Sequence, residues 1–442
     1  MTIGRGYKKA IHLKEQTAFD TGVTPDIDLE IVSEDIKIVP EEIISNGING
    51  NADPTRRLMG AVKIYGTIDT EAIPEKGIGL MHKQAFGEVS SAEVQTVTIS
   101  ASNNKIDFDI GGSELHATID SGTYAIGLTQ ADTGTLCAKV HAAIVAAEAT
   151  GTYTVTYSRS THKITIAETG ETVTSFSILW KTGTNTATCA AVALGFAASL
   201  LQSALTDSTG AQTYTGTVNI YYCFDHTFTL ADEMHAYGLS LNLNRDIEQH
   251  KLIGVKVDSL TITAAAKAIL MIKYGIIARS NEAGTIIANA LSTLNPLTFL
   301  GGTISIDSSA ADVKNMTVEL KRNLDPDNFK AYGQYISKLE SKDGSRLITG
   351  TLAKDYDSTV AAIWAKFVAG TAATLSAVWT GDTITGSFKY SLTLTFPNIV
   401  YQEFTPGTGG RAMSDVSIPF RALPSGETHP MTAVLRNTEV SI

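Results

Sequence analysis

The chain has 442 residues, enough for two to four domains of ordinary size. Hydrophobic residues make up 43% of it and charged residues 18%, a composition that can bury sizeable cores and that excludes wholesale disorder. The formal net charge is −11, and no basic run is longer than a dipeptide such as Lys8-Lys9, so tight binding of nucleic acid is disfavoured.

The cysteines and the apolar segments point to a protein that is made in a reducing compartment and not inserted in a membrane. Cys137, Cys189 and Cys223 are far apart and form no C-x-x-C motif, so we expect buried free thiols. Residues 1–20 lack the apolar run of a signal peptide. The most apolar window, 187–205, is rich in Ala, Ser and Thr and is interpreted as a buried segment.

Outside residues 90–216, apolar residues mostly alternate with polar ones, which is typical of strands that bury one face. Val and Thr, which favour pleated and half-buried surfaces, are abundant. We therefore expect a mainly β protein. The expected strands lie, in chain order, at 34–38, 57–68, 255–262, 304–306, 316–320, 392–396 and 416–420.

Two short helices are expected among these strands. The first passes through 80–83 and ends at Gly87. The second has one apolar face, spaced i, i+3, i+4, i+7 and i+8, formed by Val360, Ile363, Trp364, Phe367 and Val368. Asp357 or Ser358 is suited to begin this helix, and Gly370 is suited to end it.

The two helices end two similar stretches of sequence. The distance from Gly66 to Gly87 is 21 residues, and that from Gly350 to Gly370 is 20. An Arg-Leu pair opens each stretch, and an alternating strand precedes each one. We interpret this as an internal duplication, with the alternative that any two strand–turn–helix units look alike.

Residues 90–216 are rich in Thr, Ala and Ser and are expected to form an inserted α+β domain. The elements expected there are strands 94–99 and 106–110 joined by an Asn103-Asn104 turn, a helix over 136–147, a hairpin of 153–157 with 164–166, and a strand at 176–180. The predicted organisation is a first module at 1–89, the inserted domain at 90–216, completion of the first module and a linker at 217–290, and a second module at 291–442.

No catalytic or cofactor motif is found, neither G-x-S-x-G, H-E-x-x-H, a Walker loop nor G-x-G-x-x-G after a strand. We therefore predict no enzyme, no cofactor and no catalytic, cofactor-binding or metal-ligating residue. The densest ionisable group consists of Asp225, His226, Asp232, Glu233 and His235. On one strand His226 and His235 point to opposite faces, so an ordinary polar strand end is favoured over a metal site.

The remaining histidines and a group of aromatic residues have ordinary interpretations. His12, His82, His116, His162 and His250 have no obvious partners in the sequence and are taken as surface or helix-face histidines. The aromatic group could form a sugar-stacking platform, but strand packing is favoured; it consists of Tyr214, Tyr221, Tyr222, Phe224 and Phe228.

An ordered series of weak motifs covers about two thirds of the chain, everything except the inserted domain. Its four stretches are 57–87, 226–230 with 254–262, 299–307, and 394–399 with 416–423. Together they resemble the tail tube proteins of long-tailed, siphophage-type bacteriophages. The inserted domain also resembles a small module of phage tail proteins, through Asn103-Asn104-Lys105-Ile106, Leu179-Trp180 and Leu194-Gly195-Phe196.

The resemblance implies a structural virion protein with two tandem β-barrel or sandwich modules, each with a short flanking helix. Subunits would join into rings, and the rings would stack into the tube through which the genome is delivered. If the duplication holds, a ring consists of three chains with pseudo-sixfold symmetry; otherwise it consists of six. The expected partners are other copies of the chain, the tape measure and tail terminator proteins, and DNA that passes without specific binding.

The resemblance also places the protein in the virion tail, after synthesis in the host cytoplasm. A negative lumen is expected to repel DNA phosphates, and the inserted domain is expected on the outer wall. The loops 44–57 and 338–346 and the terminal arms 1–30 and 424–442 are expected to contact neighbouring rings. Two alternatives remain: a β-rich virion adhesin or decoration protein that binds host-surface glycans through the inserted domain, and an enzyme with a metal site at 225–235.

Overall fold

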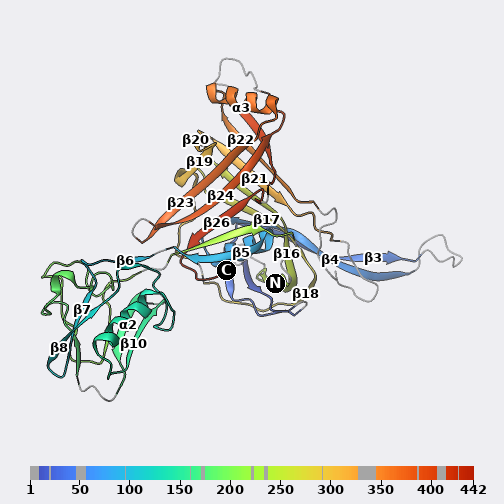
Figure 1. Cartoon of the computed structure of the whole chain (residues 1–442). Coiled ribbons are helices and arrows are strands. Elements are labelled where there is room, and N and C mark those ends of the chain that lie inside the picture. The colour runs from blue at the N-terminus through green and yellow to red at the C-terminus, as the bar shows by residue number, and fades with distance from the viewer. Residues whose placement is uncertain are drawn as a thin grey trace.

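The structure is a computed structural model of the whole chain (Figure 1). It describes residues 9–18, 21–45, 56–94, 96–159, 161–170, 175–220, 223–232, 237–290, 292–326, 345–385, 388–405, 415–426 and 428–442. The protein is mainly β, as predicted, and antiparallel pairing joins eighteen of the described strands into one sheet system, which we call the body. No helix in the described part of the chain is both long and apolar enough to cross a membrane.

The body contains most of the elements. They are β1 (Ala10–Glu15), β2 (Ile27–Leu29), β3 (Ser33–Ile44), β4 (Arg57–Glu71), α1 (Lys76–Phe86), β5 (Gly87–Glu93), β14 (Phe224–Leu230), β15 (Leu239–Asn244), β16 (Gln249–Ala265), β17 (Met271–Ala278), β18 (Ser280–Ala283), the 3-10 turn η3 (Phe299–Gly301), β19 (Gly302–Ile306), β20 (Ser309–Ala310), β21 (Asn315–Lys321), β22 (Leu347–Asp355), α3 (Ser358–Ala369), β23 (Ala373–Thr385), β24 (Phe388–Tyr401), β25 (Asp415–Ala422) and β26 (Thr432–Asn437).

A smaller lobe is attached to the body through β5 and β14, and Figure 1 shows it to one side of the large sheet. Its elements are β6 (Val97–Ile99), β7 (Lys105–Ile110), β8 (Ser113–Thr118), β9 (Gly122–Tyr124), α2 (Leu136–Ala147), β10 (Tyr153–Ser158), β11 (Lys163–Glu168), β12 (Phe176–Ile178), the 3-10 turn η2 (Thr186–Thr188) and β13 (Thr213–Thr215). The lobe has its own hydrophobic core, which includes Trp180 and much of the window 187–205, and the three cysteines are free and buried.

One strand pairing expected in the lobe is wrong. The strands near 97–99 and 106–110 exist, but they are not joined as a hairpin: β6 pairs with β9, and β7 pairs with β8. The turn that closes the β7–β8 hairpin is Gly111-Gly112, whose φ angles of 60° and 89° suit a two-residue turn in which both residues have positive φ. The Asn103 side chain instead bonds the backbone of Ser100 and Thr98, so Asn103 caps its own loop.

The helix boundaries follow the expected capping residues. The Asp357 carboxylate accepts hydrogen bonds from the backbone N–H groups of Thr359 and Val360 at 2.9 and 3.3 Å, and Gly370 ends α3 with φ of 65°. Helix α1 ends at Gly87, with φ of 100°.

Two sets of elements in the body repeat the same strand pairings in the same order. In the first set β1 pairs with β2 and β15, β3 with β4, β4 with β17, and β16 with β15, β17 and β18. In the second set β19 pairs with β20 and β23, β21 with β22, β22 with β25, and β24 with β23, β25 and β26. Each set has one helix, α1 or α3, after its fourth strand.

The register repeats as well as the order. Gly66 on β4 faces Ile36 on one side and Ile276 on the other, and Gly350 on β22 faces Val318 and Phe420. A glycine is required at both places because a Cβ would collide with the neighbouring strand. At Gly66 it would meet the backbone of Asp35, and at Gly350 it would meet the ring of Phe420.

The lobe and its two connecting strands interrupt the first set between α1 and β15. We call β5 and β14 the stalk, because they pair with each other along their whole length and carry the lobe at their far end. The second set passes directly from α3 to β23. The two sets share one hydrophobic core.

The two sets join edge to edge within the chain. The second half of β16 pairs with β21, with Ile262 opposite Val318 and Ala264 opposite Met316, and we call this pairing the internal joint. A second contact runs from the stalk to the last strand, where β14 pairs with β26.

Replacing Gly350 by Ala is expected to destabilise the protein by about 1–3 kcal/mol, because the new methyl group must displace the Phe420 ring in a fully packed core. Thermal or urea unfolding measures this change. Thr349→Ala, on the opposite and polar face of the same strand, is the matched control and should change stability by much less. Equal effects of the two substitutions would contradict the packing argument.

His82 offers a pH test of the same core. It lies fully buried in α1, with Nδ1 2.9 Å from both the Ile78 carbonyl oxygen and the Tyr274 hydroxyl, and burial lowers its pKa to about 4. The neutral form therefore stabilises the fold fully above pH 6.5, the ordinary histidine pKa, and this contribution is lost as the pH falls toward 4.

From pH 7 to pH 5 the wild-type protein should lose about 2 kcal/mol more unfolding free energy than His82→Leu, which cannot take up the proton. Denaturant unfolding at the two pH values measures the difference. Parallel losses in the two proteins would show that His82 is not the group responsible.

Candidate assembly surfaces

One continuous stretch of sheet separates the core from a polar surface. Seven strands follow one another in the order β3, β4, β17, β16, β21, β22 and β25. Alternate residues of each strand are buried, as in Ile348, Gly350 and Leu352 of β22. The residues between them form the opposite side of the sheet, which we call the polar face.

The polar face is rich in threonine, and its charges are nearly balanced. Its threonines include Thr67, Thr261, Thr263, Thr317, Thr349 and Thr351. On the described residues of these strands, leaving out the outer part of β3 and β4, it carries carboxylates and cations in similar numbers. The charged residues include Asp35, Asp69, Glu71, Glu319, Asp355 and Asp415, with Lys37, Lys63, Lys256, Lys273, Lys321 and Arg421.

The negative charge of the chain lies mostly elsewhere. Residues 87–230, the stalk and the lobe, hold 12 acidic and 5 basic residues, a net charge of −7 out of −11. The remaining residues hold 33 acidic and 29 basic ones. The strongly acidic wall that the net charge suggested is therefore not what the described polar face presents.

Strand β3 forms an open edge of this sheet. Among the described residues it pairs with β4 alone, whereas β21, its counterpart in the second set, lies between β22 and β16. The part of β3 that corresponds to the paired stretch Asn315–Lys321 is 33–39, as Ile36 and Val318 face equivalent glycines. Pro40 comes directly after this stretch. Because proline has no backbone N–H, it cannot donate a hydrogen bond to a further strand, and the pairing edge ends there.

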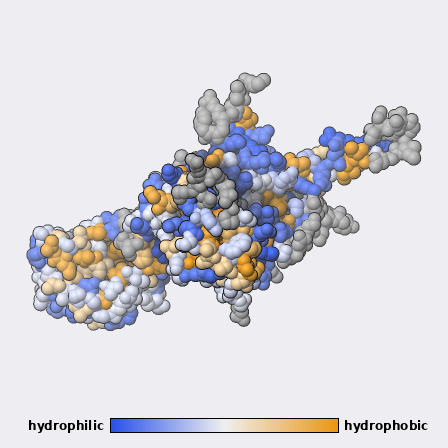
Figure 2. All heavy atoms as spheres, turned by 90° about the horizontal axis from the view of Figure 1, so that it is seen from above, coloured by the Kyte–Doolittle hydropathy of each residue, from blue (hydrophilic) through white to orange (hydrophobic). Residues whose placement is uncertain are grey.

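The outer parts of β3 and β4 leave the body as a hairpin arm with exposed apolar side chains. Figure 2 shows hydrophobic atoms along this arm. Exposure reaches 60% for Leu58 and 63% for Met59, and Ile43 and Ile44 are also exposed. Most of the loop 44–57 that was expected to contact neighbouring rings lies outside the described residues, as does most of 338–346. Apolar side chains this exposed on a projecting hairpin are typical of contact surfaces.

The predicted apolar face of α3 is only partly covered. Val360 and Ile363 are buried, but Trp364 and Val368 are exposed by 42% and 69%. On α1 the outer face is covered by the stalk, where the tilted rings of Phe86 and Phe228 have their centroids 6.1 Å apart, and the second set has no such strands. The outer face of α3 is therefore exposed because the second set has no strands that correspond to the stalk.

The structure does not bring the described members of the 225–235 group together. Asp225 forms a two-bond ion pair with Arg436, at 2.6 and 2.7 Å. His226 lies on the other face of β14 and is buried between Ser91 and Asn437. Asp232 pairs with Arg346, while Glu233 and His235 lie outside the described residues.

A different histidine has acidic neighbours that were not evident in the sequence. His116 lies 2.8 Å from Asp107 and 3.9 Å from Glu114, because the three residues face each other across β7 and β8. Both carboxylates already accept hydrogen bonds from the backbone N–H groups of Thr184 and Asn185. This cluster therefore fastens the loop before η2 to the hairpin. Only the β7–β8 register, with Asp107 opposite His116, could have revealed it.

The other singled-out residues belong to cores or surfaces. Tyr214, Phe224 and Phe228 are buried, which fits strand packing, whereas Tyr221 and Tyr222 lie outside the described residues. His12 is buried 2.9 Å from Asp28.

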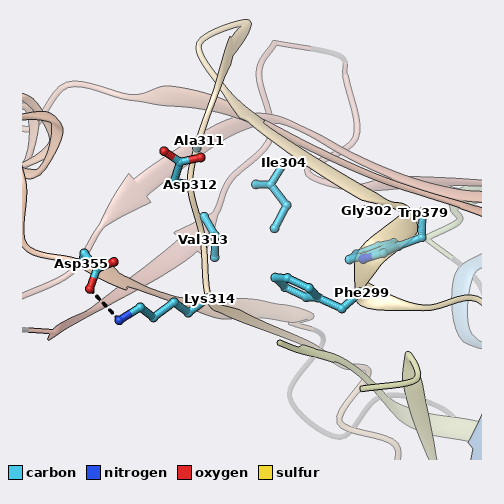
Figure 3. A pocket seen from close by; sticks show the side chains of 9 residues that line it. All are labelled: Phe299, Gly302, Ile304, Ala311, Asp312, Val313, Lys314, Asp355 and Trp379. Carbon is cyan, nitrogen blue, oxygen red and sulfur yellow. Dashed lines mark hydrogen bonds and ion pairs between the residues drawn. The ribbon is translucent and has the colours of Figure 1, made fainter. Parts of the chain in front are cut away.

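Figure 3 shows a shallow pocket in the second set. Phe299, Ile304, Val313 and Trp379 form its apolar part, and its charged residues include Lys314 and Asp355, which are paired with each other at 2.5 Å. The pocket thus presents an apolar hollow and a neutralised ion pair, with no nucleophile beside a base.

The family model described as phage tail tube protein matches residues 184–422, which run from the end of the lobe through the internal joint to β25. No curated protein matches the chain. Since this family model covers more than half of the sequence, the chain belongs to the phage tail tube protein family, whose members are structural, non-catalytic proteins of the virion tail.

Proposed function

We propose that this protein is the subunit that polymerises into stacked rings, and that the rings form the channel for genome delivery. Three chains make one ring, in which six equivalent sets of strands surround the lumen. The observation that carries this proposal is the internal joint, where β16 of the first set pairs with β21 of the second.

The internal joint supplies a pattern for the contact between chains. In the second set β24 takes the place of β16, because both strands pair with the strand before them and with the two that follow. In the first set β3 takes the place of β21 and has an open edge. Tyr401 at the end of β24 corresponds to Val257 of β16, because Phe420 and Ile276 face equivalent glycines. The chain that continues from Gln402 after β24 would therefore meet β3 of the next chain, a head-to-tail contact that generates a ring when the rotation closes.

The ring number follows from the duplication. If the contact between chains repeats the geometry of the internal joint, six sets close the ring and three chains supply them. A ring of six chains is the alternative if the two sets are not duplicated modules.

The polar face is the surface we assign to the lumen. It runs uninterrupted across the internal joint, and its threonines and nearly balanced charges offer DNA phosphates no basic track. Passage without binding then depends on the lack of a cationic surplus rather than on strong repulsion. The acidic lobe lies outside the ring wall, and the hairpin arm reaches an adjacent ring.

The same pairings suggest domain limits for the proposed modules. The first module comprises 10–86 with 239–283, the insertion comprises the stalk and lobe at 87–230, and the second module runs over 302–437. The tape measure and tail terminator proteins are the expected partners at the lumen and at the end of the tube.

Electron microscopy of the purified protein over a concentration series tests the proposal. Rings or hollow tubes with threefold symmetry are expected, with six similar densities around the lumen and three protruding lobes. Sixfold protrusions would favour six chains in a ring. A compact monomer that never associates, even with tube ends present as seeds, would contradict the proposal.

A single proline tests the edge contact. Ile36 N–H and C=O are bonded on the side away from β4, so Ile38, two residues along, also directs its N–H to the open edge. Ile38→Pro should abolish ring formation and leave the monomer folded, as judged by circular dichroism and microscopy. Ile38→Val keeps the N–H and should assemble normally. Normal rings from Ile38→Pro would show that β3 is not the contact.

The alternative function, glycan binding by an adhesin, is tested on the same protein. A glycan array with the full chain should show no binding if the lobe is only a surface domain of the tube. Specific binding to one class of host-surface sugar, combined with failure to form rings, would favour the adhesin.

A further inference from the structure

The open edge of β3 carries a side-chain cap. The N–H of Ile36 donates a hydrogen bond to a Glu34 carboxylate oxygen at 3.1 Å, and the Ile36 carbonyl accepts one from Arg245 Nη2 at 2.6 Å. These are backbone groups that point away from β4, where a further strand would bind. Both are occupied by side chains of the same chain.

The cap is held together by charge. Arg245 donates two hydrogen bonds to Glu34, at 3.1 and 2.7 Å, and Lys9 donates a third at 3.0 Å. The Glu34 side chain is only 2% exposed, whereas that of Arg245 is 26% exposed. Burial opposes ionisation, but the hydrogen bonds from Arg245, Lys9 and the Ile36 N–H outweigh it and hold the pKa of Glu34 below its ordinary value.

The equivalent place in the second set is built differently. Met316 stands on β21 where Glu34 stands on β3, two residues before Val318 and Ile36 respectively. Met316 is buried, opposite Ala264 of β16. At the strand that is already paired the chain has an apolar residue, and at the strand that is still open it has a buried carboxylate.

We propose that Glu34 and Arg245 form a removable cap, which blocks the edge of β3 until a second copy of this chain displaces it. This inference rests on the proposed ring, because the displacing strand is the counterpart of β16 in the neighbouring chain. The cap occupies the N–H and C=O of Ile36, which correspond to those of Val318 that face Ile262 across the internal joint. Assembly therefore has to break the cap.

The arrangement allows the cap to open without disturbing the sheet. Arg245 follows β15 in the turn before β16, so its side chain can swing into solvent while both strands stay paired. A charged residue at an exposed strand edge opposes pairing with the wrong chain. The cap thus raises the concentration at which the subunits associate and keeps newly made chains apart.

Glu34→Met is the direct test, because it gives β3 the residue that β21 already has. It removes the acceptor for the Ile36 N–H and the partner of Arg245, so the critical concentration for ring formation, measured by light scattering and microscopy, should fall about tenfold. Arg245→Ala should lower it in the same direction. Lys37→Ala, which breaks the exposed pair with Asp35 on the same strand, is the matched control and should change little.

The outcomes separate this inference from the proposed ring. If the wild-type protein forms rings but neither Glu34→Met nor Arg245→Ala assembles at lower concentration, with monomer melting temperatures unchanged, the cap is not a barrier and only this inference fails. A density map of the ring gives a second readout, in which the contact of Arg245 with the Ile36 carbonyl should be broken. A map that retains it would also overturn the cap. If no variant forms rings, the proposed function itself fails.

Discussion

A β-strand at the edge of a sheet leaves a row of backbone donors and acceptors without partners, and the body of this protein is arranged around that constraint. Inside the chain the second half of β16 covers β21. The corresponding edge at β3 is open, shortened by Pro40 and capped by Glu34 and Arg245. One contact is thus made within the chain, and in the proposed ring an equivalent one is left for a second chain.

The sequence predicted those features that depend on neighbouring residues. The ends of α3 were evident from Asp357 and Gly370. The spacing that predicts a duplication rests on Gly66 and Gly350, two glycines that are constrained by close contacts across strands. The β7–β8 hairpin was missed because an Asn-Asn pair and a Gly-Gly pair both signal turns, and only the long-range pairing distinguishes them. The cap was also missed, since Arg245 and Glu34 lie 211 residues apart.

The insertion explains two differences between the duplicated sets. The stalk buries the outer face of α1, and its absence from the second set leaves Trp364 and Val368 of α3 exposed. The stalk and lobe also carry most of the negative charge, so the net charge of the chain says little about the face we assign to the lumen. A sequence average was misleading here because it combined two surfaces with different surroundings.

Duplication within one chain permits a specialisation that identical subunits cannot have. In a ring of six identical chains every edge must be both stable when exposed and able to pair, so a cap would be present at all six contacts. Here one contact of each pair lies within the chain, and Met316 can be apolar because β16 covers the edge of its strand. The remaining contact carries Glu34, so three of the six contacts in the proposed ring are committed in advance and only three are controlled by the cap.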